Sequence, residues 1–310
     1  MGGDPKRHHW WPQLQSGYWT DEHNLMYVTR EDGSYFKAQP KDLGVVGHLY
    51  SIQLADGKKD VEIEKWLATE IDNPFVGIIP NLHEKSKRKS FPLRGNLSRL
   101  YSLKKLGYKT RKNIDFIGIS HDQRRIISNY LAAFLIRSPQ YLKKLVAFHE
   151  AENGAFEGVA KNLALKNMMH LFNVYSNRIM DADFIAVEAA GTHEFLFSDG
   201  GIVAREPWSD ERGLPFDIHI PISPKLSIQV IPAPTQAWPN SILVSYAANS
   251  AISIHNRIIL AQAKSQVFSR SFPPLSFIKK NWGRDAPDFI AFRRNGNEIE
   301  TKVDWSKFYH

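Results

Sequence analysis

The chain has 310 residues, of which 43% are hydrophobic and 23% are charged, an ordinary globular composition that excludes disorder throughout. The absence of cysteine excludes disulfides, thiolate metal sites and cysteine nucleophiles, and it is consistent with a reducing, cytoplasmic environment. The longest apolar run, about residues 131–136, is far shorter than the ~20 residues of a membrane-spanning helix, and the N-terminus has no apolar signal segment. We therefore expect a cytoplasmic protein that makes no membrane contact.

Strands are predicted first, at residues 25–29, 34–38 and 48–52, where aromatic and branched residues are separated by Asp-Gly or Pro. The pattern then becomes helical over residues 61–71, and this periodicity places Glu70 on the apolar face. Asn73-Pro74 is expected to end this helix, before an irregular basic loop at 85–89.

Residues 122–180 have helical periodicity, with one break at Arg137-Ser138-Pro139, because Ser138 can cap a new helix whose first turn tolerates Pro139. Residues 184–246 return to strands, and a helix is predicted at 251–267. This order predicts an α+β fold with antiparallel β regions at both ends of a central helical layer. We expect a single domain over residues 1–270, β-rich at 8–55, helical at 60–180 and β-rich at 184–268, and then a C-terminal extension at 271–310.

Positive charge is concentrated in residues 81–145. This segment has 16 lysine and arginine residues against three acidic ones, a net charge of +13, whereas the rest has 24 basic and 29 acidic residues, a net charge of −5. Such asymmetry is typical of contact with the phosphates of DNA or RNA, although a solvated basic surface without a specific ligand is the alternative. The candidate nucleic-acid contacts are Lys85, Lys87, Arg88 and Lys89 on the loop and Arg124 and Arg125 on a helix.

Two adjacent histidines, His8 and His9, are candidates for acid–base chemistry or ligand binding. Neighbours on an extended chain point to opposite sides, so at most one of them readily faces a given pocket. A surface pair without a function is the alternative, although the aromatic residues around them favour a packed segment.

Two carboxylates are further candidates. Asp199 follows a predicted strand at Ser198-Asp199-Gly200-Gly201, where it either holds a tight turn or is displayed at a site. Glu70, on an apolar helical face, either pairs with an arginine or lines a cleft. Phosphate-loop, zinc-protease and hydrolase-elbow motifs are absent from the sequence.

Several of these pieces, in this order, resemble a widespread bacterial family, the domain of unknown function numbered 4238. The residues that carry the resemblance are His8-His9-Trp10-Trp11-Pro12-Gln13, Leu49-Tyr50-Ser51, the helix 63–71, Phe197-Ser198-Asp199, Pro221-Ile222-Ser223-Pro224 and Asn256. The chain departs from the family pattern where the first motif lacks its usual arginine and where Gly200-Gly201 replaces Asn-Pro. The resemblance implies site roles for His8 or His9 and for Asp199, but the family has no established activity.

The leading hypothesis is a nucleic-acid-acting effector, a nuclease. Its catalytic candidates are His8 or His9 as acid or base, with Asp199 and Glu70 as orienting groups or ligands of a divalent metal. One alternative is a non-catalytic binding module in which these residues join the β regions to the helices. Another is a small-nucleotide hydrolase or transferase that uses the basic segment to bind phosphate.

Overall fold

The structure is a computed structural model that describes residues 7–84, 87–92, 108–109, 113–154, 156–200, 203–204, 218–231, 236–283, 291–295 and 298–302. It confirms the α+β prediction. In the described part of the chain, no helix combines the length and the apolar character needed to cross a membrane.

A large sheet forms the centre of the molecule, with strand order β12-β13-β14-β10-β15-β9-β7 and β8 paired to the end of β15. Most neighbouring strands are antiparallel, but β10 and β15 run parallel to each other. The strands are β7 (Arg88–Pro92), β8 (Tyr108–Lys109), β9 (Asn113–Gly118), β10 (Asp183–Ala189), β12 (Val203–Ala204), β13 (Ile218–Ser223), β14 (Leu226–Ile231) and β15 (Ser241–Ala247).

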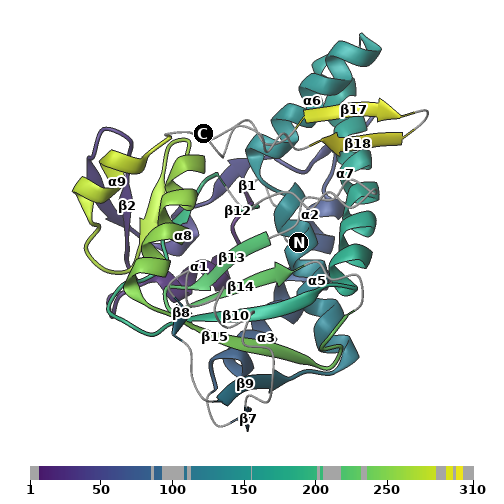
Figure 1. Ribbon diagram of the computed structural model, residues 1–310. Coiled ribbons are helices and arrows are strands. Elements are labelled where there is room, and N and C mark those ends of the chain that lie inside the picture. Colours follow the sequence, from purple (N-terminus) through teal and green to yellow (C-terminus); the bar gives the residue numbers. More distant parts are fainter. Residues whose placement is uncertain are drawn as a thin grey trace.

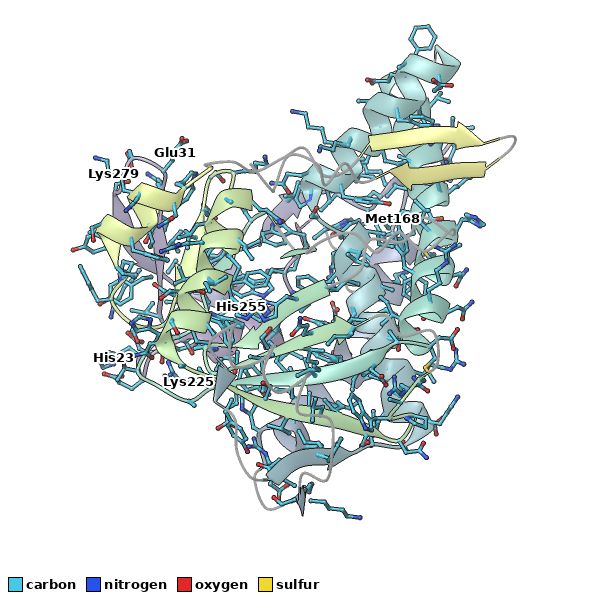
Figure 2. All side chains as sticks on the ribbon, in the orientation of Figure 1. His23, Glu31, Met168, Lys225, His255 and Lys279 are labelled. Carbon is cyan, nitrogen blue, oxygen red and sulfur yellow. The ribbon has the colours of Figure 1, made fainter. Side chains whose placement is uncertain are left out.

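Helices cover both faces of this sheet (Figure 1). On one face the main hydrophobic core joins the sheet to α3 (Asn73–His83), α5 (His121–Ile136), α6 (Pro139–Asn153) and α7 (Glu157–Met180). On the other face lies α8 (Asn249–Gln262), whose Ala251 and Ile252 pack on Val187. Figure 2 shows His255 where α8 meets the sheet, and its ring stacks on that of His219 at 4.0 Å.

A smaller sheet brings the two ends of the chain together. Its order is β11-β16-β2-β3, so that β16, late in the chain, pairs with β2 near the N-terminus. Its strands are β2 (Met26–Thr29), β3 (Tyr35–Ala38), β11 (Phe197–Ser198) and β16 (Val267–Ser269). The N-terminal strand β1 (Arg7–His9) pairs with β4 (Val45–Gly47), and β5 (Ile52–Gln53) pairs with β6 (Lys59–Asp60).

The remaining elements are short or lie after the main core. Helix α1 (Gln13–Ser16) continues into the 3₁₀ turn η1 (Gly17–Trp19), and a second turn, η2, spans Pro40–Asp42. The C-terminal part adds α9 (Leu275–Asn281) and the hairpin of β17 (Ala291–Asn295) and β18 (Glu298–Lys302). Figure 1 shows this hairpin beside α6 and α7, which extend beyond the sheet.

The predicted end of a helix at Asn73-Pro74 is wrong. Helix α2 (Glu62–Trp66) continues through a π-helical segment, η3 (Leu67–Asp72), directly into α3. Pro74 directly follows the π-helical segment, where the hydrogen bonds already depart from the α-helical pattern, and the helix continues past it.

Residues 60–180 are also not purely helical, because β7, β8 and β9 join the large sheet within this range. The predicted irregular loop is partly wrong as well, since strand β7 begins at Arg88. The predicted break at residues 137–139 is confirmed, because the Ser138 side chain accepts a hydrogen bond from the Tyr141 N–H at the start of α6.

Candidate acid–base site

His8 is the centre of a buried polar cluster at the N-terminal strand. Its side chain is fully buried, and its Nδ1 accepts a hydrogen bond of 3.0 Å from the Tyr50 backbone N–H. The ring stacks on Tyr50 at 5.9 Å and meets His48 edge-on at 6.1 Å. Because Nδ1 is an acceptor, the proton of the neutral ring lies on Nε2.

The carboxyl group of Glu64 lies beside this histidine. Its Oε2 lies 3.9 Å from His8 Nδ1. Burial raises the pKa of Glu64 to about 7, an effect that Arg137 opposes, Asp72 reinforces and a hydrogen bond from the His9 backbone N–H partly offsets. Glu64 therefore titrates near neutral pH.

Arg137 connects the cluster to the helices. This fully buried side chain donates to both carboxylate oxygens of Asp72, at 2.6 and 3.1 Å, and to the His9 carbonyl oxygen at 3.0 Å. The Tyr50 hydroxyl donates to the Arg137 carbonyl oxygen at 2.5 Å. One arginine thus fixes β1, the end of η3 and the turn before β5 against the end of α5.

Two buried polar atoms of the cluster lack hydrogen-bond partners among the described residues, Glu64 Oε2 and Arg137 Nε. Such atoms are uncommon in folded proteins and mark places where water or a ligand is expected. Glu64 is 16% exposed, and His9 and His48 are also partly exposed. A substrate could touch these three side chains.

His48 lies in a strained turn instead of the predicted strand at 48–52. Its φ is +51°, a left-handed conformation that is uncommon for residues other than glycine. The Lys161 ammonium donates to its carbonyl oxygen at 2.7 Å, which anchors the turn to α7. Strain of this kind is often found at functional sites.

The predicted position of Glu70 is wrong, because its side chain is exposed. Glu70 lies in η3, whose hydrogen bonds span five residues, so each residue turns through a smaller angle than in an α-helix. Leu67 and Ile71 stay buried, whereas Glu70 is rotated out to solvent. The half-buried carboxylate of this helix is Glu64, one residue after the buried Ile63.

Asp199 holds the turn that follows α8. Its carboxylate accepts hydrogen bonds from the backbone N–H groups of Lys264 and Ser265, both at 2.8 Å, and from the Ser265 hydroxyl at 2.5 Å. A Cβ at the next residue, Gly200, would lie 2.0 Å from the Gln262 carbonyl oxygen, so only glycine fits there. These contacts favour the turn-holding interpretation.

We expect Asp199→Ala to lower the free energy of unfolding by about 2–3 kcal/mol, because three donors lose a charged acceptor. Urea denaturation followed by circular dichroism measures this loss. The exposed carboxylate of Glu70 offers a control, and Glu70→Ala should change stability by less than about 0.5 kcal/mol. Equal effects of the two substitutions would contradict a structural role for Asp199.

The predicted nucleic-acid contacts divide into buried and exposed residues. Arg124 is buried and donates to the carbonyl oxygens of Pro239, Trp238 and Ala182 at 2.6–2.8 Å, so its prediction as a phosphate contact is wrong. Arg88 forms an ion pair of 2.6 Å with Glu188 and is only 7% exposed, so it is not available to phosphate either. The exposed members are Lys87, Lys89 and Arg125, whereas Lys85 lies outside the described residues.

The exposed cations do not surround His8. Arg125 precedes Arg137 by twelve residues on α5, about 18 Å along the helix axis. Figure 1 shows β7, which bears Lys89, at the opposite end of the molecule from β1. A substrate that reached both places would have to be extended.

In the described ranges, no three His, Asp or Glu side chains are close enough together to hold one metal ion. These described residues therefore offer no ligand set for the divalent metal that the nuclease hypothesis allows.

The motif residues form two groups. His8, Tyr50 and Glu64 converge on one cluster. Asn256 instead bridges the chain before β11, donating to the Glu194 carbonyl oxygen and accepting from the Leu196 N–H. The signal that could have identified Glu64 is its place beside Ile63 on a helix whose apolar spacing continues at Leu67.

The fold and the cluster define an α+β protein whose N-terminal strand places a buried histidine beside a carboxyl group that titrates near neutral pH. The chain belongs to the family described as protein of unknown function (DUF4238), whose model matches residues 7–272. The resemblance noted from the motifs is thereby confirmed. Comparisons with curated proteins and with solved structures give no significant match.

The stability of the protein should depend on Glu64 in a defined pH range. A carboxyl group whose pKa rises from its usual 4.5 to about 7 on folding stabilises the fold fully below pH 4.5, and this contribution is lost as pH rises through 7. Relative to Glu64→Gln, which stays neutral, the wild type should lose up to about 3 kcal/mol between pH 5 and pH 8.5. Urea denaturation of both proteins across this range measures the difference, and parallel curves would contradict the burial of the charge.

Proposed function

We propose that the chain is a cytoplasmic nuclease that cleaves phosphodiester bonds by acid–base chemistry at the His8 cluster. The observation that carries this proposal is the placement of Glu64 beside His8, with one unpartnered carboxylate oxygen and access to solvent. A raised carboxyl pKa is what a general acid requires at neutral pH. The nucleic-acid substrate is supported by the exposed cations of the basic segment 81–145 that the structure describes, among them Lys87, Lys89 and Arg125.

In this proposal, a water molecule attacks the phosphorus atom and gives its proton to His48, the partly exposed imidazole beside His8. The bond between phosphorus and the leaving oxygen breaks, and that oxygen takes the proton of Glu64. His8 positions the two groups, because Tyr50 fixes its ring. Arg137 holds β1 in place and is neutralised by Asp72, so it acts as a positioning residue.

The test is incubation of labelled single-stranded and duplex DNA and RNA with the pure protein at low salt, with and without Mg²⁺ or Mn²⁺. Binding and cleavage of at least one substrate would support the proposal, and phosphate contacts are strongest at low salt. If the protein neither binds nor cleaves any of these substrates, the proposal is overturned.

A non-catalytic interaction module is the second candidate, and the bonding of Asp199 and His8 favours it. Both side chains are buried and hold backbone N–H groups, as structural residues do. Substitutions in the His8 cluster would then lower the melting temperature without removing any activity.

A further inference from the structure

A second ionisable cluster lies on the large sheet and is not used by the proposed chemistry. Arg88 of β7 contacts Glu188 of β10 at 2.6 Å and donates to the Tyr246 hydroxyl of β15 at 3.1 Å. Tyr246 in turn donates to Asp115 of β9 at 2.5 Å, and Ser90 donates to the other oxygen of Asp115. The charges of Glu188 and Arg88 also act on the pKa of His83, and we call these five residues, together with His83, the Arg88 cluster.

The position of this cluster in the sheet is one where ligands bind in many folds. Strands β10 and β15 are parallel, and Glu188 and Tyr246 are paired in register near the carboxyl ends of both strands. In open α/β sheets, ligands bind beyond the carboxyl ends of the parallel strands, and this pair is the parallel one of the large sheet as described.

Two nitrogen atoms of the cluster have no hydrogen-bond partner among the described residues. Arg88 Nε is buried within a side chain that is only 7% exposed, and no described atom accepts its hydrogen bond. His83 Nε2 is likewise buried without a partner in the described part of the chain. Burial lowers the pKa of His83, so its ring is neutral at pH 7 and this nitrogen can donate or accept.

One side of the cluster is aromatic and partly exposed. The Tyr18 ring stacks on His83 at 5.9 Å with an interplanar angle of 20°. Tyr18 and His83 are both partly exposed, and Glu188 is 16% exposed, so solvent reaches this side.

The chemistry favours a planar, uncharged ligand over phosphate. Glu188 neutralises Arg88 and Asp115 adds a negative charge, so an anion would be repelled. Arg88 Nε, a buried donor without a partner among the described residues, belongs to the same side chain that contacts the Glu188 carboxylate, so a donor and an acceptor are neighbours, as in the groups that read base edges. Aromatic side chains beside such groups stack unpaired bases.

We propose that the Arg88 cluster binds one unpaired nucleobase of a single-stranded substrate. This inference rests on the proposed nuclease function for the identity of the substrate. The two sites lie at opposite ends of α3, because Asp72 directly precedes the helix and His83 is its last residue. The proton donor Glu64 precedes His83 by nineteen residues of this continuous helical segment, about 28 Å at 1.5 Å each, so a strand that reached both would have to be extended.

The experiment measures binding of the four free ribonucleosides, which carry no phosphate, by isothermal titration calorimetry. We expect saturable binding of at least one nucleoside, weakened about tenfold by His83→Ala and by Arg88→Lys, which keeps the charge but removes the Nε–H. His23→Ala, at an exposed histidine elsewhere, is the control and should bind as the wild type does. Thermal melting identifies any variant that fails to fold. If Arg88→Lys fails to fold, His83→Ala still tests the proposal.

The outcomes separate this inference from the proposed function. Normal nucleoside binding by Glu64→Gln would support a base site distinct from the His8 cluster. Nucleoside binding by a protein that cleaves no nucleic acid would overturn the nuclease and leave the base site standing. Absence of saturable binding to the wild type, or equal affinities of His83→Ala and His23→Ala, would overturn the base site.

Discussion

Arg137→Met should lower the free energy of unfolding by about 3–5 kcal/mol, because it leaves the Asp72 carboxylate without its buried partner. The same change removes the donor to the His9 carbonyl oxygen and so loosens β1. Urea denaturation at pH 7, followed by circular dichroism, measures the loss.

The same helix provides a control for this prediction. Arg125→Met replaces an exposed arginine of α5 and should change stability by less than about 0.5 kcal/mol. Adding Asp72→Asn to Arg137→Met should restore part of the stability, since it removes the stranded charge. If Arg137→Met were as stable as Arg125→Met, the role of Arg137 as the connection between β1 and the helices would be refuted.

Glu64→Gln should reduce the rate of phosphodiester cleavage by about 10²- to 10⁴-fold, because an amide cannot supply the proton that the leaving oxygen needs. The fold should survive, since glutamine resembles the protonated carboxyl group in size and charge. Initial rates on a fluorescent oligonucleotide, taken with melting temperatures, measure both effects.

The matched control for the rate is Glu70→Gln, in the same continuous helical segment but with an exposed side chain. Its rate should equal that of the wild type. A large loss with Glu70→Gln and none with Glu64→Gln would return the catalytic role to the residue that the sequence periodicity indicated.

Local patterns predicted much of the fold. The helices α5, α6 and α7 and the joint at Ser138-Pro139 follow from periodicity and capping, which act within a few residues. Strand β9 was missed because it is stabilised by pairing with β15, more than a hundred residues later. Helical periodicity likewise contains no sign of the π-helical segment that rotates Glu70 into solvent.

The site was partly predictable. The histidine motif led to His8, but Arg137 was read only as the residue before a helix break, because its partner Asp72 is 65 residues away in the chain. Arg88 and Arg124 were assigned to phosphate on charge alone, and their burial follows from tertiary contacts with Glu188 and with backbone carbonyl groups. The net charge of a segment predicts a phosphate-binding surface only if its charged side chains are exposed.

The pH dependence of cleavage tests the central claim most directly, namely that Glu64 is the proton donor of a nuclease. The rate of the wild type on single-stranded oligonucleotides should fall as pH rises through about 7, and this limb should be absent from the residual rate of Glu64→Gln. The account would be contradicted if the wild-type rate did not fall in this pH range. It would also be contradicted if Glu64→Gln showed the same fall as the wild type.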